Sequence, residues 1–293
     1  MPELPEVEVQ VRHLRPLITG RTITGVLVSR PKTLGPTSVR AFKNKLLGAR
    51  FLALTRKGKF LLFSLLGAKT EPITLLGHLG MTGRMYLQPK SDPLPKHAPV
   101  VLDLGSELFV FEDPRYFGRL TLQTNALARL GPEPLSPEFN PPAFHAQLKR
   151  SRQPIKVKLL DQSLLAGVGN IYASEALFRA GISPRQTART LNARQAAALA
   201  NAIKQVLHEA ILAGSTVSLN FPGRGNHDGL FYFGSTADTP KNYTERLQVY
   251  DRAGAPCPRC GGVIKRIVQA ARSTYFCPEC QRPQKFAKTA DSV

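Results

Sequence analysis

Apolar residues recur at helical spacing close to the start of the chain. Val7, Val11 and Leu14 fall on one face of a helix that runs from about residue 5 to residue 14. Pro5 suits the first turn of such a helix, and two glutamates beside it favour the positive end. The pattern predicts an amphipathic helix at the N-terminus.

A different pattern follows this helix, in which short apolar runs rich in β-forming residues alternate with Gly and Pro. Strands are predicted at Thr22 to Val28, Arg50 to Leu54 and Lys59 to Leu66. The run Gly131 to Pro137 contains three prolines that neither a strand nor a helix accommodates, so it marks a domain boundary. The pattern up to this point predicts a β-sandwich with a helix attached.

Beyond the boundary the chain becomes helical. A helix is expected to start within Pro154 to Gln162, and a second ends at Gly181, with the glycine-rich turn Ala166 to Asn170 between them. Glycines let a backbone approach a ligand closely, and a helix N-terminus presents unpaired N–H groups, so the turn is a candidate phosphate site. A tight interhelical turn needs the same glycines, but Lys156 and Asn170 near this turn favour phosphate.

All four cysteines lie near the end of the chain, in two C-x-x-C pairs with sixteen residues between them. Cys257, Cys260, Cys277 and Cys280 therefore have the spacing of a four-thiolate structural zinc site. A redox pair is the alternative, but it does not explain the duplication. Two strand-like runs between the pairs predict a hairpin that holds Arg272 at its tip.

The net charge of the chain limits the classes of molecule that it is expected to bind. A formal charge of +20 and a pI near 10.3 over 293 residues indicate a polyanionic partner, either nucleic acid or an anionic membrane surface. No acidic residue occurs between Val9 and Phe60, where single Arg and Lys residues alternate with apolar ones, so a folded basic surface that binds nucleic acid is favoured. No apolar stretch approaches a membrane-spanning length, and the acidic start does not suit a secretory signal. We expect a cytoplasmic, nucleoid-associated protein.

The first residues carry chemistry of their own. If Met1 is removed, the chain begins with the secondary amine of Pro2 next to the carboxyl group of Glu3. Such an amine can attack an aldehydic sugar carbon to give an iminium that is charged without protonation, and Glu3 could move the protons. Taken alone, however, the segment is more simply a helix start.

Five strings in this order resemble bacterial formamidopyrimidine-DNA glycosylase: Pro-Glu-Leu-Pro-Glu-Val-Glu from Pro2, His-Leu-Gly-Met from His78, Asp-Pro-Arg-x-Phe-Gly from Asp113, Gly-Val-Gly-Asn-Ile-Tyr-Ala from Gly167, and Arg-x-Thr-x-x-Cys-x-x-Cys from Arg272. The resemblance runs nearly end to end. It implies an α+β protein with an N-terminal β-sandwich (residues 1–131), a helix-two-turn-helix domain (132–246) and a zinc finger with a tail (247–293). It also implies a monomeric repair enzyme that flips oxidised purines out of double-stranded DNA, excises them and cuts the strand by β- and δ-elimination.

The resemblance assigns roles to individual residues. It implies that Pro2 is the nucleophile and Glu3 the acid and base. Lys59, with Lys57 as its competitor, is implied to assist β-elimination or to bind phosphate, and Arg272 is implied to be a phosphate contact linked to δ-elimination. Phosphate contacts are implied for His97, Lys156 and Asn170, with Arg150 and Arg152 as weaker candidates, and void-filling wedges for Met81, Arg115 and Phe117. The zinc ion is expected to be single and structural.

The sequence departs from the family pattern at two places. Pro99 stands where a second histidine is frequent, and the base-capping segment Gly214 to Tyr243 has Leu219 where a basic residue is usual. Two alternatives therefore stay open: a relative of the endonuclease VIII type that acts on oxidised pyrimidines, and a non-catalytic zinc-containing DNA-binding protein.

Overall fold

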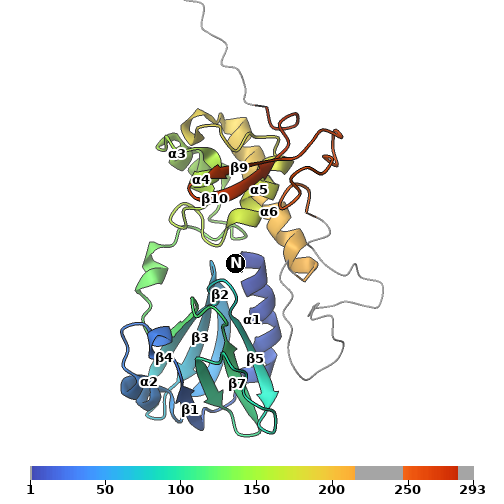
Figure 1. The fold of residues 1–293 in the computed structure, drawn as a ribbon. Coiled ribbons are helices and arrows are strands. Elements are labelled where there is room, and N and C mark those ends of the chain that lie inside the picture. The colour runs from blue at the N-terminus through green and yellow to red at the C-terminus, as the bar shows by residue number, and fades with distance from the viewer. Residues whose placement is uncertain (1, 215–246, 283–293) are drawn as a thin grey trace, which may run out of the picture. The chain divides into compact units, whose positions relative to one another are not determined.

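The computed structural model describes residues 2–214 and 247–282, which form two compact units (Figure 1). The first unit comprises residues 2–133 and the end of helix α6 from Leu207. The second comprises residues 134–206 and 247–282.

The first unit is a sandwich of two four-stranded antiparallel sheets, which confirms the predicted β-sandwich. One sheet has the order β1-β6-β7-β5, with strands β1 (Gly25–Val28), β5 (Arg84–Pro89), β6 (Val100–Asp103) and β7 (Glu107–Glu112). The other has the order β2-β3-β4-β8, with strands β2 (Arg50–Lys57), β3 (Phe60–Leu66), β4 (Pro72–His78) and β8 (Arg119–Thr121). The short elements η1 (Pro31–Leu34), α2 (Val39–Leu46) and η2 (Asn125–Arg129) complete the unit.

Aromatic rings from both sheets fill the core of this sandwich. Phe63 of β3 lies edge-on to Phe51 of β2, with ring centroids 5.9 Å apart, and to Phe109 of β7, at 5.8 Å. All three are buried in one continuous apolar cluster. Because one ring links both sheets, the core fixes the sheets against each other and makes the sandwich a rigid support for the loops at its ends.

Helix α1 (Leu4–Ile18) is longer than the predicted helix and covers one open side of the sandwich. Val7, Val11 and Leu14 are fully buried, as their spacing predicts. The Gln10 side chain donates to the Met85 carbonyl of β5 at 2.7 Å, and the Arg15 side chain donates to the Leu54 carbonyl of β2 at 2.8 Å. Both strands are sheet edges, so α1 satisfies exposed edge groups of the two sheets at once.

The second unit combines helices with a zinc-finger hairpin. Its elements are α3 (Pro141–Lys149), α4 (Ile155–Leu159), α5 (Asn170–Arg179), η3 (Ala188–Thr190), the first part of α6 (Ala193–Leu212), β9 (Lys265–Gln269) and β10 (Arg272–Phe276). The predicted helix near Pro154 is only five residues long, because the Asp161 carboxylate accepts the Ser163 N–H at 2.9 Å and turns the chain. Among the described residues, none of the helices combines the length and apolar composition of a membrane span.

The buried carboxylate of Glu175 on α5 holds the start of the zinc-finger segment. It accepts backbone N–H groups from Gln248, Val249 and Tyr250 at 2.8–3.0 Å. Burial raises the pKa of Glu175, although the three N–H bonds oppose the rise. The residues at 248–250 are therefore fixed to α5 by one side chain, whose role no local sequence pattern predicts.

Candidate active site and DNA interface

The chain start is fixed by its own helix. Glu3 is the N-cap of α1: its side chain accepts the backbone N–H of Glu6, while its own N–H donates to Glu6 Oε2 at 2.7 Å. This reciprocal capping box satisfies two helix-end donors and holds Glu3, which is 1% exposed, in one orientation. Pro2 is also buried and directly precedes the cap. The predicted nucleophile and its predicted acid and base are thus neighbours at an ordered helix start.

Lys59 lies in the two-residue turn of the β2–β3 hairpin. Lys57 pairs with Phe60 across this turn, and Gly58 has a φ of 56°, which a type II′ turn requires at its first central position. Lys59 is 8% exposed, whereas Lys57 is half-buried. The geometry therefore distinguishes the two candidate lysines, since the turn directs Lys59 towards the protein.

The surroundings of Lys59 include a neutral histidine. Burial, together with the charges of Lys59 and Arg119, lowers the pKa of His78 to about 4. His78 Nδ1 accepts the N–H of Gly80 at 3.2 Å, so the proton of the neutral ring is on Nε2. The His78 ring also packs against the Phe60 ring at an interplanar angle of 50°, with ring centroids 5.0 Å apart.

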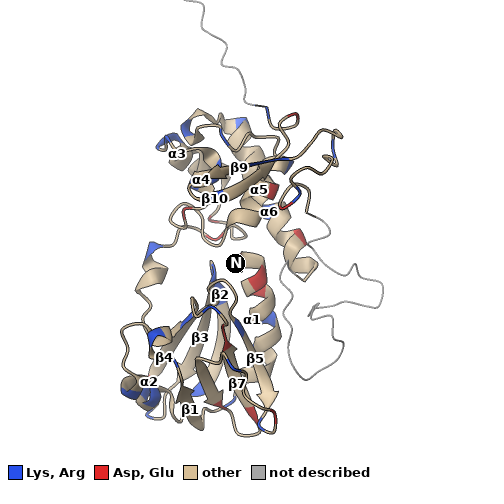
Figure 2. Ribbon diagram, in the orientation of Figure 1, with Lys and Arg blue, Asp and Glu red and all other residues tan. Residues whose placement is uncertain are grey.

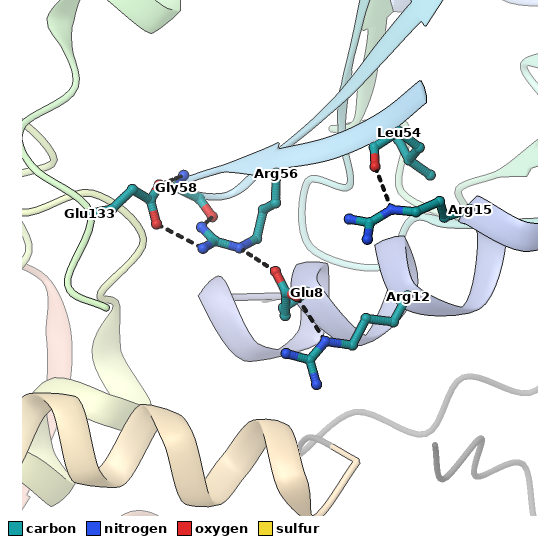
Figure 3. A network of polar contacts seen from close by, with 7 residues as sticks. All are labelled: Glu8, Arg12, Arg15, Leu54, Arg56, Gly58 and Glu133. Carbon is teal, nitrogen blue, oxygen red and sulfur yellow. Dashed lines mark hydrogen bonds and ion pairs between the residues drawn. The ribbon is translucent and has the colours of Figure 1, made fainter. Parts of the chain in front are cut away.

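Arg56 joins three segments around the same hairpin (Figure 3). Its guanidinium donates to Glu8 of α1 at 3.0 Å, to the Gly58 carbonyl at 3.0 Å and to Glu133 at 2.7 Å. Glu133 also accepts the Gly58 N–H at 2.5 Å. Hydrogen bonds from Arg12 and Arg56 hold the pKa of Glu8 below its ordinary value, although burial acts to raise it. One half-buried cation therefore ties the turn of Lys59 to the helix of Glu3.

The three predicted wedge residues lie on two turns that pack backbone against backbone. A Cβ on Gly80 would lie 2.5 Å from the Gly118 nitrogen, and one on Gly118 would lie 2.9 Å from the His78 carbonyl oxygen. The buried Asp113 links the turns, because it accepts the Thr82 hydroxyl at 2.6 Å and the Gly118 N–H at 2.7 Å. Only glycines permit this approach, so the turns hold each other in place.

The wedge side chains project from these turns. Met81 is 40% exposed and Phe117 is 53% exposed, which is unusual for large apolar residues on a folded surface. The exposed Arg115 lies over the Phe117 ring, 5.0 Å from its centroid. The structure thus brings the predicted wedges onto adjoining turns of one unit.

His97 lies beside the Arg115–Phe117 turn and is half-buried. Its Nδ1 is 3.0 Å from the Tyr116 hydroxyl, and its backbone carbonyl accepts the Asp113 N–H at 2.9 Å. Pro99, the departure from the family pattern, is buried, and its carbonyl accepts the N–H groups of Ser29 and Arg30. At this place the chain has a backbone anchor where a histidine side chain is frequent in the family.

In the second unit, Lys156 is fully buried, which the sequence did not indicate. Its ammonium donates to Asn170 Oδ1 at 2.6 Å and lies 3.5 Å from the Thr274 hydroxyl of β10. The Asn170 side chain in turn donates to the Ser273 carbonyl at 2.8 Å. Lys156 and Asn170 therefore join the glycine-rich turn to the zinc-finger hairpin, and a role for Lys156 at a phosphate has to be compatible with these partners.

The glycine-rich turn itself is shaped by one side chain. Gln162 donates to the Leu160 and Val168 carbonyls and accepts the Gly167 N–H at 2.9 Å. Helix α5 begins directly after this turn, at Asn170. The turn thus presents the N-terminus of a ten-residue helix, as the phosphate-site prediction requires.

Arg272 is the first residue of β10 and is exposed, directly after the two-residue turn of the hairpin. Ala270 and Ala271 form this turn with φ values of 46° and 58°, the positive pair of a type I′ turn. Figure 2 shows basic residues on this hairpin and on α2. The weaker candidates Arg150 and Arg152 are exposed at and just beyond the end of α3.

The four cysteines form a site that fits one structural Zn²⁺. Their sulfur atoms all lie within 4.8 Å of one another, and two of the distances are 3.5 and 3.8 Å. Tetrahedral coordination with Zn–S bonds of about 2.3 Å places sulfurs about 3.8 Å apart, so the spacing suits zinc. Gln281 supports the site by accepting the Cys277 N–H and donating to the Ile182 carbonyl, both at 2.9 Å.

Sequence reasoning missed the residues that hold the site together. The hydrogen-bond partners of Asp113, Tyr116, Arg56, Glu133 and Gln281 are not indicated by the sequence around these residues. Their partners lie up to 99 positions away in the chain, so only tertiary structure reveals them. The predicted base-capping segment lies, after Gly214, outside the described residues.

The chain is similar to known proteins over nearly its whole length. Family models match residues 1–120 (formamidopyrimidine-DNA glycosylase N-terminal domain), 130–220 (formamidopyrimidine-DNA glycosylase H2TH domain) and 254–283 (zinc finger found in FPG and IleRS). A formamidopyrimidine-DNA glycosylase of Thermus thermophilus is 44% identical, with 96% of this chain and 98% of that protein aligned, and one of Carboxydothermus hydrogenoformans is 39% identical over 96% and 100%.

Solved structures that are similar to this chain come from the same family of proteins. A Lactococcus lactis FPG mutant in complex with Fapy-dG-containing DNA has a TM-score of 0.83 and 31% identity, covering 96% of this chain and all of that one. A MutM structure with DNA containing carbocyclic 8-oxo-G has a TM-score of 0.81 and 32% identity at the same coverage. On the strength of these matches, of the sandwich, of the H2TH helices and of the four-cysteine zinc site, the chain belongs to the formamidopyrimidine-DNA glycosylase family.

Proposed function

We propose that this DNA glycosylase excises oxidised purines, 8-oxoguanine and formamidopyrimidines, from double-stranded DNA and then cuts the strand. The observation that carries the proposal is Pro2 directly before the capped Glu3, in a chain similar throughout to formamidopyrimidine-DNA glycosylases. Solved relatives are described as complexes with DNA containing Fapy-dG and 8-oxo-G, which supports this substrate class. A cytoplasmic, nucleoid-associated monomer with DNA as partner fits the charge of +20.

The proposed chemistry starts once Met1 is removed. The Pro2 nitrogen forms a bond to the sugar C1′ and loses its proton, while the damaged base leaves with the electron pair of the glycosidic bond and takes up a proton. The sugar ring then opens: the C1′–O4′ bond breaks, O4′ takes up a proton, and the Pro2 nitrogen forms an iminium with C1′. This iminium acidifies C2′, so loss of a C2′ proton expels the 3′ phosphate. A second elimination expels the 5′ phosphate, and water then releases Pro2. Glu3 is the proposed carrier of protons, held in place by its capping box.

Two cations are proposed to assist. Lys59, a buried residue of the hairpin turn that Arg56 links to the helix of Glu3, is proposed to aid β-elimination. Arg272 binds the phosphate that leaves in δ-elimination, because a guanidinium matches phosphate oxygens in pairs. The proposed phosphate contacts are His97, Asn170 and Lys156, with Arg150 and Arg152 as weaker candidates. Lys156, being buried, acts by holding Asn170 and by its charge.

Met81, Arg115 and Phe117 are proposed to fill the space that the flipped base vacates. Phe117 separates neighbouring bases, and Arg115 donates to acceptors on the unpaired base. We therefore propose a preference for lesions opposite cytosine over those opposite adenine. The support is the position of the three side chains on two adjoining turns, with Arg115 stacked on Phe117.

Oxidised pyrimidines are a second candidate substrate class, because the structure of a wild-type Lactococcus lactis relative has been solved in complex with DNA containing an oxidised pyrimidine. The experiment is to incubate the protein with duplexes carrying 8-oxoguanine, a formamidopyrimidine or thymine glycol, and to analyse the cut ends. We expect the purine lesions to be cut faster by at least about tenfold, which is about 1.4 kcal/mol in the barrier, leaving phosphates on both ends. Faster cutting at thymine glycol would favour the endonuclease VIII type, and binding without cutting would favour a non-catalytic protein.

A further inference from the structure

Tyr116 lies between the two proposed wedge residues in an unusual backbone conformation. Its φ of 55° is in the left-handed region, which an aromatic residue seldom occupies. Neighbouring Arg115 and Phe117 are not in that region, since among the described residues other than glycine the positive φ values belong only to Thr70, Tyr116, Asp251, Ala270 and Ala271. A strained residue persists only where its surroundings hold it.

The Tyr116 ring is held from two directions. The Arg30 guanidinium lies over the ring, 4.1 Å from its centroid. The hydroxyl lies 3.0 Å from His97 Nδ1, and the two rings meet edge to face at 74° with centroids 5.6 Å apart. Arg30 is itself positioned by the Pro99 carbonyl, which accepts its N–H. The side chain of Tyr116 is thus partly buried against Arg30 and His97, whereas Phe117 is 53% exposed.

The ends of the same turn are held separately. Asp113 accepts the N–H groups of Arg115 at 3.2 Å and Gly118 at 2.7 Å with its side chain, and that of Tyr116 at 3.1 Å with its carbonyl. These bonds fix where the turn begins and ends. The positive φ of Tyr116 sets the direction in which Arg115 leaves relative to Phe117, because a change at this one dihedral rotates the residues on its two sides against each other.

We propose that Tyr116 is a positioning residue for selection of the base opposite the lesion. Its ring, held by Arg30 and His97, keeps the backbone at positive φ, and that backbone aims Arg115 at the unpaired base while Phe117 stays in the stack. The inference rests on the proposed function of Arg115 and Phe117. It adds that their joint geometry depends on a side chain that does not itself enter the duplex.

The test compares substitutions that separate ring from backbone. Tyr116→Leu removes the ring and keeps a side chain that disfavours positive φ, whereas Tyr116→Asn removes the ring but tolerates positive φ. For each, excision of 8-oxoguanine opposite cytosine and opposite adenine is measured, and thermal unfolding checks folding. We expect the cytosine preference to fall by at least about fivefold in Tyr116→Leu, the lower end of what one side-chain–base pair contributes, and to stay within about twofold of the wild type in Tyr116→Asn.

A second pair tests the anchor without touching the turn. Arg30→Leu removes the cation over the ring, while Lys32→Leu removes an exposed cation two positions away in η1 as a charge-matched control. Arg30→Leu is expected to lower the cytosine preference and Lys32→Leu to leave it unchanged. These two variants test the positioning role of Tyr116 even if Tyr116→Leu does not fold.

The outcomes separate this inference from the proposed function. A wild-type protein that does not excise the lesion, or excises it equally opposite both bases, contradicts the proposed function first. Normal wild-type preference with equal losses in Tyr116→Leu and Tyr116→Asn shows that the ring acts directly on DNA and overturns the positioning role. Retained preference in Tyr116→Leu and Arg30→Leu also overturns it.

Discussion

Two hairpins of this protein each present a candidate functional cation beside a two-residue turn, but they are held in different ways. The β2–β3 hairpin of Lys59 has strands of eight and seven residues within a sheet that packs on the apolar core. The β9–β10 hairpin of Arg272 has strands of five residues and belongs to a small cluster that includes two zinc ligands. The first depends on the core and on ion pairs, and the second on a metal.

The turns of the two hairpins also differ, in their backbone strain. Gly58 adopts its positive φ without steric cost, whereas Ala270 and Ala271 both occupy the left-handed region with a side chain. A strained turn on short strands requires support from elsewhere, and the described residues that supply it are the zinc ligands and the Lys156–Asn170 pair. The comparison shows that Lys59 and Arg272 are positioned by different interactions, the apolar core with its ion pairs in one case and the zinc site in the other. A mutation or zinc removal should therefore displace one cation without displacing the other.

Removing zinc should have the largest effect. A four-thiolate site contributes on the order of 10 kcal/mol to the folding of a small finger, so chelation or Cys277→Ala should unfold the β9–β10 hairpin and displace Arg272. Affinity for a lesion duplex, measured by fluorescence anisotropy against salt, should fall, while the sandwich stays folded. Zinc-free protein with unchanged binding and cleavage would contradict the account of the second hairpin.

Lowering the pH should reduce the stability of the unit that contains the first hairpin. The pKa of His78 is about 4 in the folded protein and near 6.5 when unfolded, so the unfolded state takes up a proton first as the pH falls. The neutral, buried His78 therefore contributes to the free energy of unfolding above pH 6.5. This contribution falls by about 3 kcal/mol as the pH is lowered from 6.5 to 4. Because burial also lowers the pKa of His13, the readout is the difference in urea unfolding between wild type and His78→Gln. Parallel pH curves for the two proteins would refute the assignment.

Arg56 and Arg12 offer a matched comparison, since both pair with Glu8 (Figure 3). The Arg56 side chain is 10% exposed and that of Arg12 is 44% exposed. Arg56→Met removes the guanidinium that bridges Glu8 and Glu133 and should lower the free energy of unfolding by about 2 kcal/mol, whereas Arg12→Met should cost less than about 0.5 kcal/mol. Equal costs would show that the network around Glu133 does not brace the turn of Lys59.

The smallest expected effects have opposite signs in the two turns. Gly58→Ala should destabilise the first hairpin, and Ala271→Gly should stabilise the second, each by about 0.5–1 kcal/mol, because the left-handed cost is partly offset by the entropy of glycine. Hydrogen exchange of the amides in β2–β3 and β9–β10 measures each locally. The same sign in both hairpins would contradict the assignment of strain to the alanine turn.

Local patterns explain which features the sequence predicted. Val7, Val11 and Leu14 specify a helix face, and the paired cysteines specify a zinc site, because each signal lies within a few turns of chain or in a fixed spacing. The burial of Lys156 and the positive φ of Tyr116 depend on partners elsewhere in the fold, Thr274 in one case and Arg30 and His97 in the other. Such features follow from packing, which the sequence of the segment does not encode by itself.

The resemblance to a family predicted which residues to examine, and the structure describes what holds them. Glu3 was expected as an acid and base, and its capping box adds why it is ordered before DNA binds. The choice between Lys57 and Lys59 could not be made from Arg-Lys-Gly-Lys-Phe, because the direction of each side chain depends on the turn type at Gly58.

The measurement that tests the central claim most directly is borohydride trapping on a duplex containing 8-oxoguanine, followed by mass spectrometry of the cross-linked peptide. Reduction converts the proposed iminium into a stable amine, so we predict a covalent product at Pro2 in protein that lacks Met1. A protein extended by one residue ahead of Pro2 should give none, because its nitrogen is then an amide whose lone pair is delocalised. A trapped product at Lys59 or Lys57, or undiminished trapping with the extended chain, would contradict the assignment of Pro2 as the nucleophile.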